Sequence, residues 1–316
     1  MLNKNIKYSK TQAKPFVKWV GGKSQLIPSI EQNILNKLYK IPELTYIEPF
    51  VGGGAMFFWI LNNMKNIRKA IINDINSDLM TAYKIVRDSS LDLIIELKHI
   101  EKRFKSLQSE KSRKKFYLEM REQFNTKKLD NIENTALFIF LNRTCFNGLY
   151  RVNSKGLFNV PFGKYVNPTI CDENTIFADS KLLQKVEILT GDFEQTLPYA
   201  TDNSLFYFDP PYKPLDQTSS FTSYTKEGFN DDEQIRLKQF CDKLDKQGYL
   251  WILSNSDVKL KDPHNDFFDN LYVQYQINRV WASRAVNSNP DKRGKLTELL
   301  ITNYYNEKLI LHTQFV

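Results

Sequence analysis

The sequence contains few of the residues that bind metals or form disulfides. It has three cysteines, Cys145, Cys171 and Cys241, which are far apart, and three histidines that lie near none of them. Disulfide scaffolds and zinc sites need closely spaced cysteine or histidine pairs. This scarcity argues against a disulfide-rich secreted protein and against a zinc enzyme, and we expect no metal in the functional site.

Long apolar runs are also missing. The longest, residues 136–141, is far below the roughly 18 residues that cross a bilayer, and no apolar stretch follows the basic amino terminus. The 316 residues, of which 41% are hydrophobic and 25% charged, are enough for one large or two ordinary packed domains. We therefore expect a folded cytoplasmic protein without a signal peptide or membrane anchor.

Two segments lack acidic residues. Residues 1–30 carry six lysines before the first carboxylate at Glu31, and residues 134–171 carry only basic charges. The net charge is +8, and a basic protein of this kind attracts polyanions. Nucleic acid is the expected partner, although either segment alone is equally typical of solvated surface.

Short buried strands alternate with helices at both ends of the chain. Residues 44–48 and 70–73 are predicted strands on either side of a predicted helix at 55–61, which makes a β-α-β unit. This α/β pattern resumes after a long helical stretch at 76–141 and a hairpin around residues 153–156. The later elements are expected strands at 186–189, 205–208, 249–253, 271–281 and 296–304, with a helix at 231–245.

This order of elements predicts a discontinuous catalytic domain, residues 1–78 and 183–316, with an α/β, mostly parallel sheet. A mostly helical domain, residues 79–182, is inserted between its halves and carries the hairpin.

Three glycines, Gly52 to Gly54, follow the first predicted strand and precede a helix. Glycines there allow a ligand to approach the backbone closely, and Asp74 at the end of the next strand is typical of a carboxylate that holds a ribose. The pattern favours a cofactor containing adenosine. A tight structural turn remains the alternative, and the spacing departs from the dinucleotide pattern, which disfavours NAD.

Asp209, Pro210, Pro211 and Tyr212 follow the predicted strand 205–208. Two prolines cannot continue the strand, so the chain leaves the sheet and presents acceptors. The Asp209 carboxylate and the Pro210 carbonyl are suited to grip both hydrogens of an amino group on a planar base, with Tyr212 available for stacking. We predict a clamp that aims the nitrogen lone pair at an electrophile.

Four motifs in this order resemble one family. FVKWVGGK at 16–23, EPFVGGG at 48–54, the strand end at Asp74 and DPPY at 209–212 are similar to the DNA adenine-N6 methyltransferases that use S-adenosylmethionine. The similarity covers nearly the whole chain and is greatest to the Dam and DpnII-type enzymes, which modify GATC. The resemblance implies a Rossmann-like methyltransferase domain, an inserted target-recognition domain and a flipped-out adenine in double-stranded DNA.

The resemblance also implies roles for individual residues. The residues expected to hold the cofactor are Trp19, Lys23, Phe50, Gly52, Gly54, Asp74, Asp192, Phe193 and Asp209. The residues expected to contact DNA, mostly within 141–165, are Lys18, Phe146, Asn147, Leu149, Arg151, Pro161 and Tyr165. Arg151 matches the arginine that reads a guanine edge, and Phe146 stands where some relatives have a tyrosine, which retains stacking without the hydroxyl.

Three alternatives remain at this point. RNA adenine and protein glutamine methyltransferases use related clamps, and a regulator without activity can keep the fold. The aspartate before Pro-Pro-Tyr and the intact motifs favour a DNA-modifying enzyme. We expect it to act as a monomer, in a prokaryote or phage and on nucleoid DNA, in Dam-like marking or in protection against a restriction endonuclease that acts on the same site.

Overall fold

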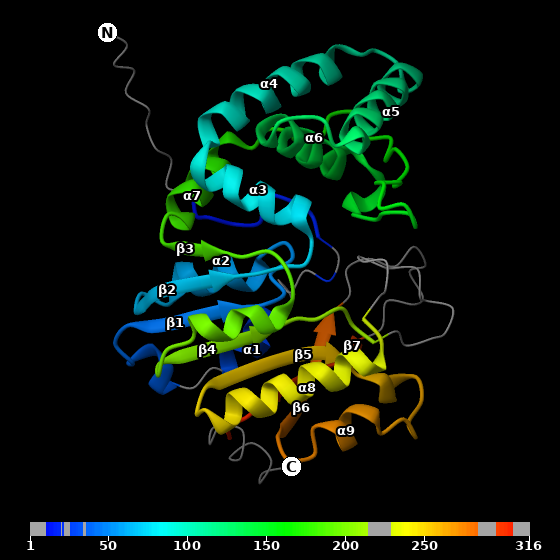
Figure 1. Cartoon of the computed structure of the whole chain (residues 1–316). Helices are drawn as coiled ribbons and strands as arrows, with labels where there is room; N and C mark the ends of the chain where they lie inside the picture. Colours follow the sequence, from blue (N-terminus) through cyan, green and yellow to red (C-terminus); the bar gives the residue numbers. More distant parts are fainter. Residues whose placement is uncertain are drawn as a thin grey trace. The chain divides into compact units, whose positions relative to one another are not determined.

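The computed structural model describes residues 11–19, 21, 26–33, 36–213, 229–283 and 295–305. The chain divides into two compact units (Figure 1). Unit 1 contains Met1–Gly22, Gly52–Asn63 and Asn76–Ile188, and unit 2 contains Lys23–Val51, Met64–Ile75 and Leu189–Val316. The functional division into 1–78 with 183–316 and 79–182 stays a prediction.

Unit 2 holds six strands of a seven-stranded sheet, in the order β2-β1-β4-β5-β7-β6. β1, β2, β4 and β5 are parallel, whereas β7 pairs antiparallel with both β5 and β6. Every residue of β1 and β4 is buried, as expected for central strands covered on both faces. This mixed, mostly parallel sheet confirms the predicted α/β fold class. The strands are β1 (Leu44–Glu48), β2 (Ile67–Ile72), β3 (Val186–Ile188), β4 (Ser204–Phe208), β5 (Leu250–Ser256), β6 (Gln276–Ser283) and β7 (Lys295–Thr302).

The helix α8 (Asp231–Lys246) packs against one face of the sheet in unit 2. Its buried residues Leu237, Phe240, Cys241 and Leu244 recur at helical spacing and join one hydrophobic core with the apolar side chains of β4 and β5. Asn230 caps its first turn, which is acidic and complements the helix dipole. The remaining short elements of unit 2 are α1 (Ile27–Asn33), η2 (Asn36–Tyr39), η4 (Phe193–Tyr199), η6 (Val258–Leu260) and α9 (Phe267–Leu271).

One predicted strand begins later than expected. The prediction of a strand over residues 271–281 was wrong for its first part, because α9 extends to Leu271 and β6 starts at Gln276. Phe268 and Tyr272, four residues apart, are both fully buried, and Tyr272 N donates to Phe268 O. This spacing places both rings on one helical face, and their burial overrides the local preference of aromatic residues for strands.

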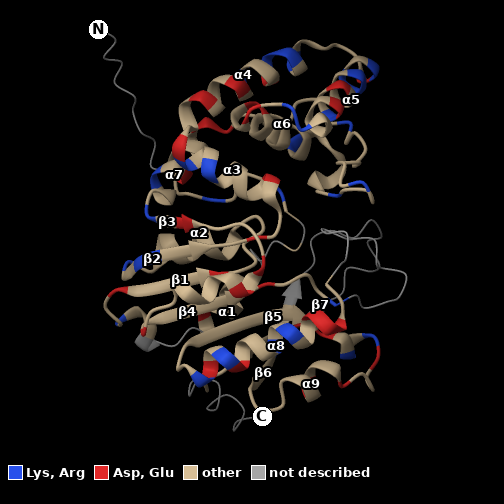
Figure 2. Ribbon diagram, viewed as in Figure 1, with Lys and Arg blue, Asp and Glu red and all other residues tan. Residues whose placement is uncertain are grey.

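Unit 1 is mostly helical, which confirms the predicted run of helices over residues 76–141. Its central helix α6 is buried along residues 135–142 and contacts α3, α4 and α5. Figure 2 shows charged residues along α4 and α5 but few on α6, as expected for a helix enclosed by others. No helix in the described part of the chain is long and apolar enough to span a membrane. The helices of unit 1 are α2 (Ala55–Asn63), α3 (Ser77–Asp88), α4 (Ser90–Ser106), α5 (Glu110–Thr126), α6 (Asn131–Thr144), η3 (Phe146–Gly148) and α7 (Glu173–Leu183).

The predicted hairpin around residues 153–156 is present in unit 1. Val152 and Phe158 form an antiparallel bridge, and Asn153 N donates to Leu157 O at 2.9 Å. Gly156 N closes the turn on Asn153 O at 2.8 Å. The pairing consists of isolated bridges rather than full strands, so the hairpin is short and its tip residues Ser154 and Lys155 are exposed.

Candidate active site

The sheet of unit 2 has a switch point between β1 and β4. From β1 the chain continues to β2 on one side, whereas β4 and β5 lie on the other side. In open α/β sheets, ligands bind beyond the carboxyl ends of the strands at such a point. Phe50 after β1, Asp74 after β2 and Asp209 after β4 all follow strands that end at this edge.

Asn73 joins the segments at the β1 and β2 side of this edge. Its side chain is fully buried, and Nδ2 donates to the carbonyls of Pro49 at 3.0 Å and Gly191 at 2.9 Å. Its Oδ1 accepts from Gln195 Nε2 at 2.6 Å. The backbone on either side of Asn73 is thereby fixed next to the segments that carry Phe50 and Asp192. Sequence reasoning did not single out Asn73.

Arg236 on α8 holds Asp192. The guanidinium lies 2.7 Å from the Asp192 carboxylate, also pairs with Glu194 and Glu233, and covers the Phe193 ring at 4.2 Å. Partial burial alone would raise the pKa of Asp192, but the hydrogen bonds from Arg236 and from Glu194 N lower it. Asp192 therefore stays ionised with a fixed orientation. Phe193 is buried against Phe50, with ring centroids 5.3 Å apart.

The segment after β4, residues 209–213, is called the clamp loop below. Among the described residues, five hydrogen bonds with other side chains hold its backbone and the side chains of Asp209 and Tyr212. Ser254 Oγ donates to Asp209 Oδ1 at 3.1 Å, Gln234 Nε2 donates to Pro211 O at 3.2 Å, and Tyr212 OH donates to Glu298 Oε2 at 2.6 Å. Lys213 is held at both ends of its backbone, because its N–H donates to Asn255 at 3.4 Å and its carbonyl accepts from Ser256 at 2.8 Å.

The chemical groups predicted for the clamp are thus set in a rigid frame from β5, β7 and α8. Burial raises the pKa of Tyr212 well above its usual range, and the nearby Asp209 and Glu298 carboxylates raise it further, so the phenol stays neutral. Among the described residues, no hydrogen bond engages the Pro210 carbonyl. This arrangement offers a carboxylate and a backbone carbonyl as acceptors for an amino group.

A second carboxyl group lies buried at the same edge. Glu48, the last residue of β1, accepts a 2.5 Å hydrogen bond from Tyr46 OH. Burial raises the pKa of Glu48 well above its usual range; the bond from Tyr46 opposes this rise, whereas the charge of Asp209 adds to it. Two carboxyl groups with different environments therefore lie at the ends of β1 and β4.

In unit 1, Trp19 packs on the predicted glycine turn. Gly52 has a φ of +47°, and a Cβ there would lie 2.8 Å from Trp19 Cδ1, so a side chain is excluded both by conformation and by space. The Trp19 ring also stacks on Tyr150, with centroids 5.5 Å apart. The structure thus brings Trp19, Gly52 and Gly54 into one region of unit 1, whereas Lys23 lies outside the described residues.

Asn142 on α6 links Lys18 to the turn at η3. Its Oδ1 accepts from Lys18 N at 2.8 Å, and its Nδ2 donates to Lys18 O at 2.8 Å and to Gly148 O at 3.0 Å. Gly148 has a φ of +64°, and a Cβ there would lie 2.5 Å from Lys18 Cδ. Lys18 Nζ also lies over the Tyr165 ring at 4.8 Å. The predicted DNA contacts Lys18 and Tyr165 are therefore neighbours, and the buried Asn142, which sequence reasoning missed, fixes the first of them.

Arg151 begins the hairpin. Its Nε donates to Oδ1 of Asn159, on the opposite arm of the hairpin, at 2.8 Å. Asn159 N donates in turn to Arg151 O at 3.1 Å. The base of the hairpin is tied to α5, since Asn125 exchanges two hydrogen bonds with the backbone of Phe158. This pairing orients the arginine side chain before any ligand is bound.

The other predicted DNA contacts lie on the same segment. Phe146 is 51% exposed, which is unusual for a large aromatic side chain, and its N–H donates to Pro161 O at 2.8 Å. Pro161 is also exposed, and Leu149 is partly exposed. Asn147 has a φ of 54°, a left-handed conformation that asparagine tolerates. An exposed ring on a hydrogen-bonded turn is suited to stacking against a base.

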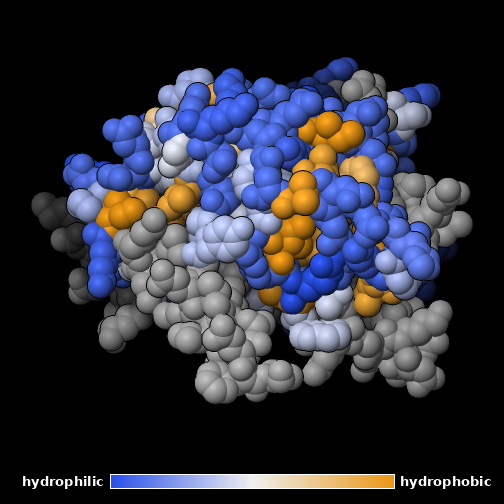
Figure 3. Space-filling model, turned by 90° about the horizontal axis from the view of Figure 1, so that it is seen from below, coloured by the Kyte–Doolittle hydropathy of each residue, from blue (hydrophilic) through white to orange (hydrophobic). Residues whose placement is uncertain are grey.

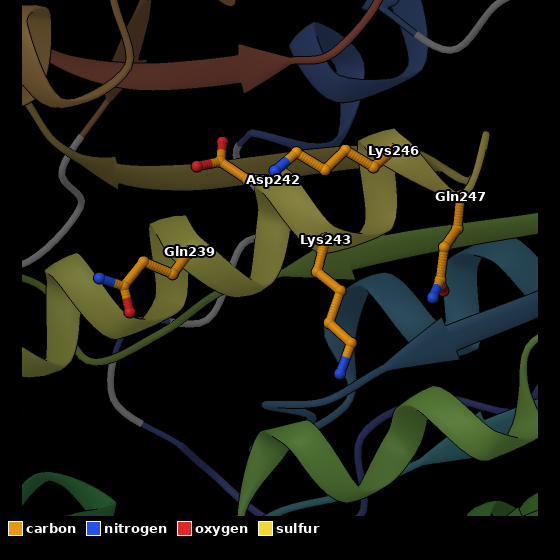
Figure 4. A pocket seen from close by; sticks show the side chains of 5 residues that line it. All are labelled: Gln239, Asp242, Lys243, Lys246 and Gln247. Atoms are coloured by element: carbon orange, nitrogen blue, oxygen red, sulfur yellow. The ribbon is translucent and has the colours of Figure 1, made fainter.

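One surface depression lies elsewhere, on α8. It has a volume of about 400 Å³ and is lined by side chains along the carboxyl-terminal half of α8 and its cap, Gln239, Asp242, Lys243, Lys246 and Gln247 (Figure 4). Because α8 leads into β5 at Leu250, this part of the helix lies toward the amino ends of the strands. The depression is therefore remote from the carboxyl edge and is not the candidate site. Within the described residues, no group of histidine, cysteine and acidic side chains is arranged to hold a metal ion.

The comparisons with known proteins agree with these features. Residues 19–286 match the family model of the D12 class N6 adenine-specific DNA methyltransferases. The chain is 51% identical over 297 residues to the type II methyltransferase M.MjaIII of Methanocaldococcus jannaschii, which covers 93% of this chain and 100% of the relative. It is 39% identical to the type II methyltransferase M1.LlaDCHI of Lactococcus lactis subsp. cremoris, over 95% of this chain and 99% of the relative, and 31% identical to the DNA adenine methylase of Escherichia coli K12, over 90% and 93%.

These matches confirm the resemblance that the four motifs indicated, and they favour DNA over the RNA, protein glutamine and regulator alternatives. Enzymes of this kind take the methyl group from S-adenosylmethionine. The chain belongs to the D12 class of N6 adenine-specific DNA methyltransferases.

Proposed function

We propose that this enzyme methylates N6 of the adenine in duplex GATC and that the clamp loop holds the target amine. The observation that carries the chemistry is the frame of five hydrogen bonds around residues 209–213. A loop with this many supports costs little reorganisation when a substrate binds, which is the condition for electrostatic catalysis.

In this mechanism Asp209 and the Pro210 carbonyl each accept one hydrogen of a flipped-out adenine amine, and Tyr212 and Pro211 border the base. Gripping both hydrogens favours a pyramidal nitrogen whose lone pair points at the methyl donor. S-adenosylmethionine, when bound, supplies a methyl group on a sulfonium, which leaves as a neutral thioether. In such a transfer the nitrogen–carbon bond would form as the carbon–sulfur bond broke, and the extra proton on nitrogen would then pass to water, so Asp209 need not remove a proton before the attack.

The cofactor-binding residues are part of the same proposal. Asp74 follows β2 at the carboxyl edge of unit 2, where a carboxylate can accept from ribose hydroxyls, and the partly exposed Phe50 ring lies near Phe193. We assign Asp192 to the adenine end of the cofactor, with Arg236 fixing its carboxylate. Trp19, Lys23, Gly52 and Gly54 are assigned to the cofactor from their motifs.

For the DNA, we propose that Arg151 reads a guanine edge and that Phe146 occupies the space beside the extruded adenine. The same proposal assigns contacts with bases or with the DNA backbone to Asn147, Leu149, Pro161, Tyr165 and Lys18. The hydrogen bond from Arg151 Nε to Asn159 supports this reading, since a pre-oriented guanidinium loses less freedom when it forms a bidentate contact.

The catalytic domain is proposed to be residues 1–78 and 183–316, and the target-recognition domain residues 79–182. We propose that the enzyme acts as a cytoplasmic monomer on the nucleoid of a prokaryote or on phage DNA. The face shown in Figure 3 is mostly hydrophilic where its residues are described, with hydrophobic areas among the hydrophilic ones. Because two relatives are named type II methyltransferases, we include protection against an endonuclease of the same specificity.

The test is transfer of radiolabelled methyl from S-adenosylmethionine to two duplexes of equal composition, one with a single GATC and one with GTAC. We expect label only on the GATC duplex, recovered as N6-methyladenine. Label on both duplexes would refute the sequence preference but keep the chemistry. Label on neither would refute the proposed substrate.

A further inference from the structure

Two buried hydroxyl groups stand behind the carboxylate of Asp209. Tyr207 OH on β4 lies 3.1 Å from Ser254 Oγ on β5, and Ser254 Oγ lies 3.1 Å from Asp209 Oδ1. Ser254 is 0% exposed and Tyr207 is 1% exposed. Tyr207 and Asp209 are two residues apart at the end of β4, so their side chains lie on one face of the sheet.

Ser254 Oγ also lies 3.3 Å from the Phe208 carbonyl, but the Asp209 carboxylate is the nearer acceptor and, being charged, forms the stronger hydrogen bond with the serine proton. An ionised carboxylate only accepts, and a serine hydroxyl carries one proton. When Ser254 donates its one proton to Asp209, the hydrogen bond between the two hydroxyl groups needs the proton of Tyr207. Tyr207 is then the donor and Ser254 the acceptor. Burial raises the pKa of Tyr207 well above its usual range, with the Asp209 charge as the next cause, which keeps the phenol protonated as a donor.

The two neighbouring carboxyl groups accept hydrogen bonds from other donors. Glu48 on β1 faces the same side of the sheet, but its carboxyl accepts from Tyr46 at 2.5 Å. Glu298 on β7 is occupied by Tyr212. Among the described residues, the buried Glu48 and the partly buried Glu298 thus each accept a hydrogen bond from a tyrosine, and the partly buried Asp209 accepts one from Ser254.

We propose that Tyr207 and Ser254 are positioning residues that form a hydroxyl relay to Asp209 and set the rotation of its carboxylate toward the target amine. This inference rests on the proposed role of Asp209 in the clamp. The bond to Oδ1 fixes the plane of the carboxylate, and hence the direction of its other oxygen. A rotation of this plane would misalign the amine even though the substrate still binds.

The test compares kinetic constants of Ser254→Ala, Tyr207→Phe and the double variant on a duplex that the wild type methylates. We expect Ser254→Ala to lower kcat about 10-fold and Tyr207→Phe about 3-fold, as for the loss of a supporting hydrogen bond to a charged group, while KM for DNA and for S-adenosylmethionine stays within about twofold. Because Tyr207 acts only through Ser254, the double variant should be no slower than Ser254→Ala.

Two control variants match these changes. Ser204→Ala removes a buried serine hydroxyl at the amino end of β4, where it accepts from Thr201 N. Tyr272→Phe removes the hydroxyl of a buried tyrosine that has no hydrogen-bond partner among the described residues. Both should keep wild-type kcat. Thermal unfolding of every variant separates a change in rate from loss of fold.

Three results discriminate the outcomes. An unchanged kcat in Ser254→Ala, or a double variant whose loss is the product of the single losses, would overturn the relay. A matched loss in Ser204→Ala would also overturn it, since it would point to general destabilisation. Asp209→Ala is measured in parallel. If Asp209→Ala is inactive while Ser254→Ala is fully active, the relay is refuted but the clamp is not. If Asp209→Ala is active, the proposed clamp itself is refuted.

Discussion

The clamp loop and the hairpin that carries Arg151 are supported in different ways. Residues 209–213 are held by side chains from β5, β7 and α8, and these supports reach four of the five residues. One arm of the hairpin is tied to α5, where Asn125 binds the backbone of Phe158 and both Tyr117 and Arg121 donate to Val160 O, whereas its tip is exposed. Bond formation requires alignment within a fraction of an ångström, whereas reading DNA requires side chains that adapt to a deformable duplex. The side chains that support the clamp loop thus lie at the proposed reaction centre, whereas the exposed tip of the hairpin is the part suited to adapt to DNA.

The largest effect should come from a change in the clamp loop. Asp209→Ala removes one of the two acceptors for the amine, and we expect kcat to fall by about 10³-fold or more with little change in DNA affinity. Rapid-quench measurement of a single turnover, together with DNA binding by fluorescence anisotropy, checks both parts. A parallel loss of DNA binding would assign Asp209 to recognition rather than chemistry.

Asn142→Ala should have the next largest effect, within unit 1. The change leaves the backbone of Lys18 and the Gly148 carbonyl without their buried amide, and we expect unit 1 to lose about 3 kcal/mol. Urea unfolding followed by circular dichroism measures this loss. Asn134→Ala on the same helix is the control, because the side-chain oxygen of Asn134 has no hydrogen-bond partner in the described chain. An equal loss of stability in Asn134→Ala would contradict a special role of Asn142.

The hairpin itself provides a third prediction. Arg151→Ala should lower the preference for GATC over CATG, in which the guanine and the cytosine are exchanged, by about 10-fold or more, because a bidentate contact to guanine contributes about 1–3 kcal/mol of discrimination. Lys155→Ala, at the exposed tip, should weaken binding to both duplexes equally. Competition between the two duplexes for methyl transfer gives the ratio directly. If Arg151→Ala leaves the ratio of methyl transfer to the two duplexes unchanged, another residue reads the guanine.

The smallest effect concerns the segment 11–19, which carries Lys18 and Trp19. Asp179 on α7 accepts from Lys14 N at 3.0 Å, and burial raises the pKa of Asp179 to about 8. Since the unfolded carboxyl titrates near 4, unfolding releases a proton between these values, and the contribution of Asp179 to stability falls as the pH rises from about 4 to 8.

Asp179→Asn keeps the acceptor and removes the charge, so we expect it to stabilise unit 1 by about 1 kcal/mol at pH 8 and to change little at pH 5. Melting temperatures at the two pH values check this. Asp172→Asn should act in the opposite sense, because hydrogen bonds from Thr175 outweigh its burial and lower the pKa of Asp172. Equal shifts of Asp179→Asn at both pH values would contradict the titration.

The sequence predicted the elements and residues whose signal is local. The strand end at Glu48, the glycine turn, the clamp loop and the turn at 153–156 each depend on neighbouring residues, because proline, glycine and apolar runs constrain the backbone where they occur. The order of the elements then predicted the sheet, since consecutive β-α units form parallel strands.

The supporting polar contacts could not be predicted in the same way. Arg236 and Asp192 are 44 positions apart, Tyr212 and Glu298 are 86 apart, and both pairs depend on which strands and helices become neighbours. The three polar residues Ser254 to Ser256, at the end of an otherwise apolar strand, were a signal that sequence reasoning passed over. Polar residues buried at a strand end are expected mainly where a site needs supports.

The long-range ties of the segment 11–19 have a consequence for synthesis of the chain. Lys14 is made early, yet its partner Asp179 leaves the ribosome 165 residues later, and Arg143, which donates to Phe16 O, comes 127 residues later. At common rates of translation, the delay to Asp179 is about 10 to 30 s. Until Arg143 has been made the segment has neither support, and until Asp179 has been made it lacks the second, so one of the first parts of the protein to be made is among the last to become native.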